Sequence, residues 1–345
     1  VFVVGETRFD GELSGDMSGQ VPSLKGKIFS RHVNILDFLA APITPTEKLP
    51  QTNGQSGNQP AVDFIFGKDP LPFNLLNQAN IALDLVIEEL VGSTIALDRV
   101  ATSISLRSGQ LIVAPLVLDM VGGRINAAIR VDASKTDPTI SMQAKAVNLD
   151  VASGFRVSGT EVPIAGALNA VMSVEAIGRS PRSLARTLGG RIEAVMVNGR
   201  IQTGAFDLLG LDIFSWLLSR SASNGFTETQ CLLIRLDSAD GVATLTNFIL
   251  DTEGLRTGGT GGINLANETL ALVFDPEPKN ASFAKFGTPV KIKGRLASPQ
   301  VDLKAINLAA NMLARIALSP VKMLESFLPN VANGNHAKKH PCATG

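Results

Sequence analysis

The chain has 345 residues, of which 45% are hydrophobic and 18% charged, and its 31 basic residues balance its 31 acidic residues. This length allows two or three domains, or one long repetitive domain, with ample apolar material for a core. Zero net charge gives no electrostatic reason to expect nucleic acid as a partner. Without tyrosine and with one tryptophan, the chain lacks the aromatic platforms on which carbohydrate and peptide binders commonly depend.

The chain opens on VFVVGETRFDGELSG, which reads as the middle of a strand, and we interpret residues 1–40 as the end of a preceding β repeat. Residues 41–60 are rich in Pro, Gly, Asn and Gln and predict a flexible linker or loop. No run reaches the roughly 18–20 apolar residues of a membrane span, and no signal peptide is visible. We therefore expect that the native N-terminus, with any membrane anchor, is missing from this chain.

Strict alternation of apolar and polar residues dominates residues 61–329. In one run, Ile125, Ala127, Ile129 and Val131 alternate with polar residues. Many such short runs predict antiparallel strands with one apolar and one polar face. The fold class we predict is mostly β: a long, twisted antiparallel sheet or groove of repeated hairpins.

Turn signals separate these runs about every 10–15 residues. Asn-Gly and Asp-Gly pairs favour the positive φ angles of tight hairpins. The predicted turns are Ser108-Gly109, Gly122-Gly123, residues 135–138, Asn198-Gly199, Asp240-Gly241 and Asn267-Glu268. The glycine-rich run 258–262 is placed between strands and lacks the lysine and helix of a phosphate loop.

A few amphipathic helices are predicted near the C-terminal end, at residues 182–188, 206–220 and 304–328, followed by a disordered tail at 330–345. The helix at 206–220 is the most apolar, and we expect it to cap the sheet or to touch a membrane. The candidate residues for this contact are Phe206, Leu209, Ile213, Trp216 and Leu217.

No motif for catalysis is present: there is no HExxH, CxxC or GxSxG sequence, and His336 and His340 lie in the predicted tail. We expect no enzyme activity, catalytic residue, metal site or cofactor. Cys231 lies in an apolar run and Cys342 in the tail, and two cysteines predict no disulfide framework and leave the compartment open.

Four segments, in order, resemble the C-terminal conserved region of the AsmA family. They are DPLPFNLLNQANIALDLVIEEL (69–90), LRSGQLIVAPLVLDMVGGRINAAIRVDA (106–133), GGRIEAVMVNGRIQTGAFDLLGLDIF (189–214) and PVKIKGRLASPQVDL (289–303). The resemblance covers roughly residues 62–325. It also implies kinship with TamB- and YhdP-type bridge-like envelope proteins.

The resemblance implies an elongated β groove without catalytic residues, located in the periplasm of a Gram-negative bacterium and associated with the inner membrane. It further implies a role in outer-membrane homeostasis, most simply the transfer of phospholipid between the two membranes. The expected partners are phospholipid, a membrane, and other envelope proteins or a second copy of the chain.

A groove for acyl chains needs a continuous apolar surface, which the alternating faces could supply. The candidate groove residues are Leu83, Leu85, Ile87, Ile104, Leu118, Ile129, Met142, Leu168, Met172 and Leu272. Alternation alone does not distinguish a lined groove from the filled interior of a β-sandwich. Two other functions also stay open: an assembly factor that pairs its exposed sheet edge with outer-membrane protein strands, and a periplasmic scaffold.

Overall fold

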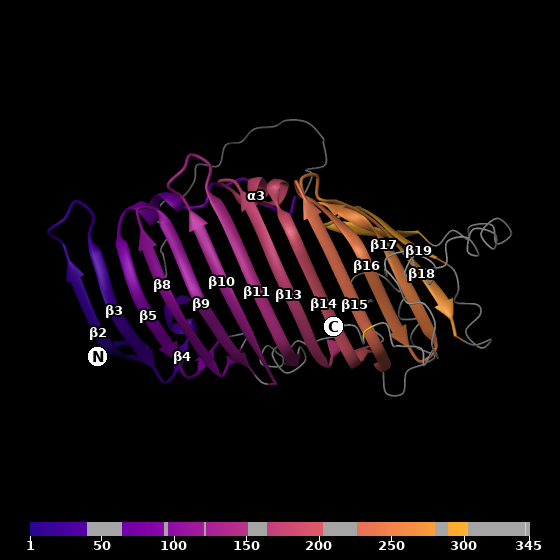
Figure 1. The fold of residues 1–345 in the computed structure, drawn as a ribbon, viewed down its shortest axis with the longest axis horizontal. Coiled ribbons are helices and arrows are strands. Elements are labelled where there is room, and N and C mark those ends of the chain that lie inside the picture. Colours follow the sequence, from indigo (N-terminus) through magenta and orange to yellow (C-terminus); the bar gives the residue numbers. More distant parts are fainter. Residues whose placement is uncertain are drawn as a thin grey trace, which may run out of the picture.

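The computed structural model describes residues 1–39, 64–92, 96–120, 122–150, 164–202, 226–279 and 289–302, together with Cys342. One long sheet occupies almost all of this chain, with its strands side by side from the N-terminal end to the C-terminal end (Figure 1). The predicted mostly-β fold is confirmed. The predicted helices at 206–220 and 304–328 lie outside the described residues, as do the linker at 41–60 and most of the tail.

Seventeen strands make up the large sheet. They are β1 (Phe2–Val4), β2 (Thr7–Asp16), β3 (Ser23–Ser30), β5 (Asn80–Ile87), β8 (Arg99–Arg107), β9 (Gln110–Met120), β10 (Gly123–Asp132), β11 (Thr139–Asp150), β12 (Ile164–Ala165), β13 (Ala167–Ile177), β14 (Gly189–Gln202), β15 (Phe226–Ala239), β16 (Val242–Thr252), β17 (Leu255–Asn264), β18 (Thr269–Pro278), β19 (Val290–Arg295) and β20 (Ser298–Asp302). The strands follow chain order, and β12 and β13 both pair with β14.

Every pairing in the large sheet is antiparallel except that of β3 with β5. This parallel pair joins residues 23–30 directly to residues 80–87, so the first strands belong to the same sheet as the rest. Beside it lies a small sheet of β4 (Val33–Asn34), β6 (Leu90–Val91) and β7 (Ala96–Leu97), with helix α1 (Leu36–Leu39) next in the chain after β4.

Tight turns connect the hairpins where the sequence predicts them. Ser108 and Gly109 have φ angles of 50° and 78°, and Asp240 and Gly241 have 48° and 71°. Two consecutive positive φ angles match the right-handed twist of the flanking strands. Two predicted breaks are wrong: Asn198-Gly199 lies inside β14, and the glycine run 258–262 lies inside β17. Pairing continues past Asn198 with β15 and through the glycine run with β18, so the strands do not end there, although Asn198 keeps a positive φ of 54°.

The predicted helix at 182–188 is confirmed as α3 (Pro181–Thr187), at the upper rim of the sheet in Figure 1. Ser180 caps it, because its hydroxyl accepts the backbone N–H of Ser183 while the Ser183 side chain accepts the N–H of Ser180. A 3₁₀ turn, η1 (Phe73–Asn77), precedes β5. No described helix is long and apolar enough to span a membrane.

Buried apolar residues form three separate clusters instead of one core. One joins Phe9, Val33, Ile87 and Val100 near the small sheet. A second gathers around Met196 on β14 to β16, and a third around Leu255 on β17 to β19. Among the described residues, neither β10 nor β11 contributes a buried apolar side chain. The middle of the sheet is therefore much less covered than its two ends.

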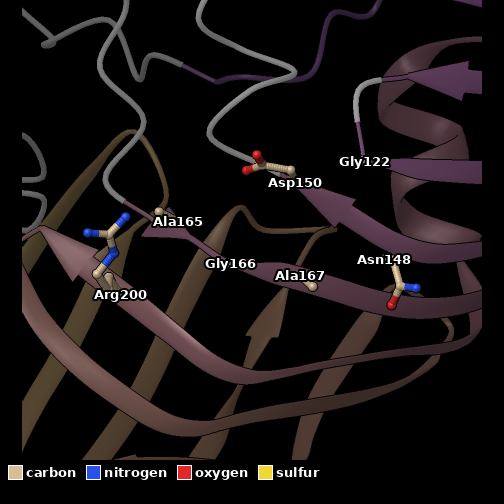
Figure 2. Close-up of a pocket in the computed structure, with 7 residues that line it drawn as sticks. All are labelled: Gly122, Asn148, Asp150, Ala165, Gly166, Ala167 and Arg200. Carbon is tan, nitrogen blue, oxygen red and sulfur yellow. The ribbon is translucent and has the colours of Figure 1, made fainter.

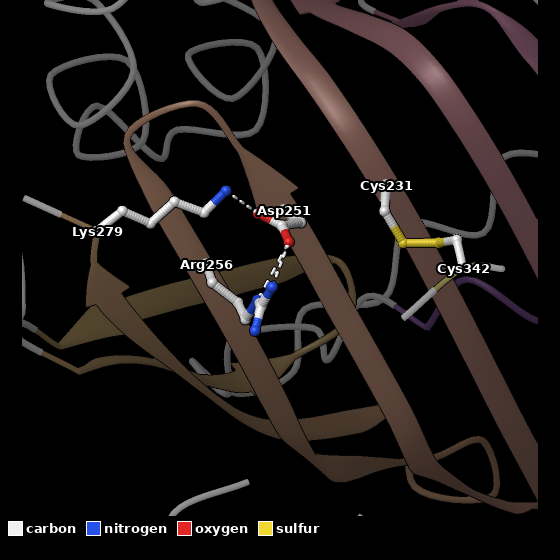
Figure 3. The surroundings of a disulfide bond; sticks show 5 residues. All are labelled: Cys231, Asp251, Arg256, Lys279 and Cys342. Carbon is white, nitrogen blue, oxygen red and sulfur yellow. Dashed lines mark hydrogen bonds and ion pairs between the residues drawn. A yellow bond between two sulfur atoms is a disulfide. The ribbon is translucent and has the colours of Figure 1, made fainter. Parts of the chain in front are cut away.

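The two cysteines are paired: Cys231, at 0% exposure on β15, forms a disulfide with Cys342, 111 residues later. The sequence predicts no disulfide framework, and this single bond is a feature that the sequence leaves open. The sequence conceals the pairing because one cysteine lies in a strand and the other in a polar tail. The bond ties the end of the chain to the sheet (Figure 3).

Met196 is fully buried in the second cluster, so we expect Met196→Ala to lower the free energy of unfolding by about 2–5 kcal/mol through lost packing and a residual cavity. Val197, 42% exposed, supplies the control: Val197→Ala should cost less than about 1 kcal/mol. Urea denaturation followed by circular dichroism measures both. Equal losses for the two variants would contradict the assignment of Met196 to a packed cluster.

Candidate functional site

The ten candidate groove residues lie on one face of the sheet. In an antiparallel ladder, directly opposed residues point to the same side, so rows of partners trace a face across strands. One row runs the length of the sheet from β5 to β19 and contains three of the candidates. Its members in order are Leu85, Thr102, Leu116, Ala127, Ala144, Met172, Ile192, Leu236, Leu245, Gly261, Leu272 and Ile292.

Three parallel rows hold the remaining candidates. One joins Leu83, Ile104, Val113, Ile129, Met142 and Val174. Another joins Ile87, Val100, Leu118, Ile125, Ala146, Ala170, Ala194 and Ile234. A shorter row joins Leu168 to Met196, Leu232 and Leu250. Together the four rows define the apolar face. The apolar face also includes four residues outside the candidate set: Val113, Val174, Ile192 and Leu236. The alternation of apolar and polar residues in the sequence would have identified them as well.

The exposure of these side chains shows that the face is not a filled core. Ile87 is buried at 5% exposure, whereas the other nine candidates are half-buried. Ile192, in the middle of the longest row, is 36% exposed. In the interior of a β-sandwich these positions would be covered by a second sheet. The described residues form no such cover over β10 and β11.

The opposite face, here called the polar face, carries charge pairs between neighbouring strands, although Ile112, Val171 and Val197 are also exposed on it. Arg235 on β15 lies 2.6 Å from Glu193 on β14, and Arg191 pairs with Asp237 on the same two strands. The hydrogen bond from Arg191, followed by that from Thr246, lowers the pKa of Asp237. Such exposed pairs add little stability, but they keep this face hydrated. The sheet therefore has one face of apolar rows and one face that mixes charged and apolar side chains.

Figure 2 shows a shallow pocket of about 320 Å³ at the rim of the sheet. Glycine and alanine line much of it, with Asn148, Asp150 and Arg200 as its polar residues. Asp150 opposes Ala167, one residue beyond the Leu149–Leu168 pair, so this part of the pocket lies on the polar face. The pocket is thus separate from the apolar face. Among the described residues no cluster of His, Cys, Asp and Glu could hold a metal ion.

The predicted contact residues Phe206, Leu209, Ile213, Trp216 and Leu217 lie outside the described residues.

Near the disulfide lies an ion triad that the sequence does not predict. Asp251, whose side chain is 1% exposed, lies 2.5 Å from Lys279 Nζ and 2.8 Å from an Arg256 nitrogen (Figure 3). The triad links β16, β17 and the residue after β18, and Asp251 directly opposes Cys231 on β15.

Burial raises the pKa of Asp251, but hydrogen bonds from Lys279 and Arg256 outweigh it, so the pKa lies below its ordinary value of 3.8. A carboxyl whose pKa is lower in the folded than in the unfolded protein stabilises the fold at any pH above the unfolded-state pKa. This stabilisation is lost as the pH falls through the pKa of the folded state.

We expect Asp251→Asn to be clearly less stable than the parent at about pH 7, and the difference to shrink as the pH falls below the ordinary carboxyl pKa and through the lowered pKa of the parent. Urea midpoints measured across this range provide the test. Asp240→Asn, in an exposed turn, is the matched control and should leave the midpoint unchanged. A difference between Asp251→Asn and the parent that stays constant with pH would show that the charge of Asp251 is unimportant.

Comparison with known proteins identifies relatives of the chain. The family model for the AsmA family matches residues 2–248. The match begins in β1 and ends in β16, so it includes the first forty residues and stops before the segment at 289–303. AsmA family protein YhjG of Escherichia coli (strain K12) is 24% identical over 253 residues, which are 73% of this chain and 37% of YhjG. The matched region thus spans little more than a third of this relative. No solved structure matches the chain.

Proposed function

The chain belongs to the AsmA family, and on this premise we propose that it is a cell-envelope protein whose apolar face binds the acyl chains of phospholipids. Lipid would move along this face between the inner and outer membranes, with head groups left in water. Proteins of this family are not known enzymes. The absence of enzyme activity in this chain stays a prediction.

A single observation carries the proposal: the rows of the apolar face are continuous across strands and only half-buried. From β5 to β14 they cross six strand spacings, about 29 Å at roughly 4.8 Å each, which is close to the hydrocarbon thickness of about 30 Å in a bilayer. Each methylene group removed from water contributes about 0.8 kcal/mol. A face of this size holds acyl chains without specific contacts.

The disulfide supports the proposed location in the periplasm of a Gram-negative bacterium. Disulfides form and persist in oxidising compartments and are rare in the cytosol. Cys231 and Cys342 are bonded to each other, which supports a compartment of this kind. Attachment to the inner membrane remains part of the proposal.

A second candidate function rests on the open edge of the sheet. Residues 10–16 of β2 pair on one side with β3, and the described residues supply no strand on the other side. Leu13 is 48% exposed there. An unpaired strand edge is a template for another strand. An assembly factor for outer-membrane proteins would use this edge instead of the apolar face.

A charge placed on the apolar face should remove bound lipid while the protein stays folded. We expect the parent, purified in mild detergent, to carry phospholipid at a reproducible stoichiometry in native mass spectrometry. Asp at Leu85, Ile104, Leu118, Ile129 or Met142 should reduce the lipid-bound fraction several-fold, because a carboxylate is costly to bury against acyl chains. Gln143→Asp, next to Met142 but exposed on the polar face, should retain lipid.

Circular dichroism confirms that each variant is folded before its lipid content is compared. Full lipid occupancy in every folded Asp variant would exclude the apolar face as the binding surface. If the parent carries no lipid, the assembly-factor function through the open edge of β2 is favoured instead. Measuring whether the protein binds unfolded segments of a β-barrel protein then tests that function.

The disulfide gives an independent test of the compartment. We expect protein isolated from the periplasm to show no thiol that reacts with maleimide after denaturation, and two after reduction. A Cys231→Ser variant should show one reactive thiol without reductant. Two free thiols in denatured, unreduced protein isolated from cells would contradict the periplasmic proposal.

A further inference from the structure

The segment that precedes β5 runs along the rim of the sheet. Residues 64–80, here called the strap, contain η1 and end at the start of β5. At one end the strap contacts the β17–β18 turn, and at the other it contacts the β8–β9 turn. These two turns are separated by most of the width of the sheet.

The far end of the strap is held by a buried carboxylate. Glu268, 1% exposed in the β17–β18 turn, accepts the backbone N–H groups of Ile65 and of Phe66, the latter at 3.0 Å. Its partners are therefore about two hundred positions away in the chain. Two backbone donors on one buried carboxylate form a charge-assisted anchor.

Helix α3 holds the strap through Arg182. The guanidinium donates to the carbonyl of Phe66 at 3.0 and 3.2 Å, lies 3.8 Å from the ring centre of Phe64, and is 4.0 Å from Glu268. The backbone N–H of Arg182 also donates to the carbonyl of Gly67. A cation above an aromatic ring adds to the attraction of the ion pair.

Two further contacts fix the remainder of the strap. The N–H of Leu71 donates to the carbonyl of Arg179 at 2.7 Å, just before α3. The side chain of Asn80 accepts the N–H of Ser108 in the β8–β9 turn. The strap is thus attached to the rim at both ends and in the middle.

The length of the strap matches the width that it crosses. Its fourteen residue steps from Phe66 to Asn80 reach about 40 Å, at about 2.0 Å for each 3₁₀ residue and about 3.3 Å for the others. The nine strand spacings from β5 to β17 measure about 43 Å in a flat sheet. With η1 intact the strap is slightly shorter than the flat width, so flattening the sheet requires η1 to unwind or an anchor to release.

We propose that the strap is a tension element that fixes the curvature of the sheet, and that Glu268 and Arg182 form its releasable anchor. Release of this anchor lets the rim lengthen and the sheet open. The inference concerns the shape of the sheet and holds whatever the apolar face binds.

The test measures the width of the sheet directly in the full chain. Ala82 on β5 and Ala271 on β18 are exposed and can be replaced by cysteine and labelled with nitroxides, with the native disulfide left oxidised. Double electron–electron resonance then reports the distance between the labels. We expect Glu268→Ala to give a longer and broader distribution than the parent. Glu253→Ala, in the exposed turn at the opposite rim, should match the parent.

Loss of Glu268 could also unfold the turn, so a second variant keeps every anchor and adds slack. Insertion of Gly-Ser-Gly-Ser between Lys68 and Asp69, both exposed, should lengthen the distance by about 3 Å, the amount by which the flat width exceeds the reach of the strap. The same insertion between Gly19 and Gln20, in the exposed β2–β3 turn, should leave it unchanged. A folded strap-insertion variant with the parent distribution would overturn the proposal. The strap proposal does not depend on whether the parent binds lipid.

Discussion

The fold depends on one constraint: every row of opposed residues must stay on the same side of the sheet from strand to strand. A slip of one residue at any ladder would move the apolar side chains of all later strands to the wrong face. Strand β9 shows how the constraint is kept. An extra residue near Pro115 shifts its register against β8, and the same shift recurs against β10. The two shifts compensate, and the apolar rows continue past the bulge.

This constraint also explains how far the sequence predicts the fold. Alternation identifies the strands and faces, and pairs such as Asp240-Gly241 locate the hairpins, because both signals are local. The ten candidate groove residues share one face for the same reason. How exposed each of them is depends on distant segments. Ile87 and Ile129 lie in the same alternating pattern, yet the small sheet packs near Ile87, whereas the described residues leave Ile129 half-buried.

The features that the sequence does not predict all join distant segments. The β3–β5 pair, the Cys231–Cys342 bond and the contact of Glu268 with Ile65 each connect residues that no local pattern relates. Asp251 reads in the sequence as one more polar residue beside a turn. Only its position between Arg256 and Lys279 makes it a buried ion. At Asn198 the local preference is only partly overridden, because the backbone keeps a positive φ of 54° while pairing with β15 resumes at Gly199 and the strand continues.

The anchor at Glu268 has a consequence for the order in which the protein folds. The hairpins from β8 onwards connect neighbours in sequence, so each can form as soon as its two strands are available. Ile65 and Phe66 precede these hairpins, but their partner follows almost all of them. During synthesis from the N-terminal end, the strap can attach only after the β17–β18 turn has been made. Its attachment comes late, when only β19 and β20 remain to be added, and a chain truncated before residue 268 would keep its earlier hairpins but lack this step.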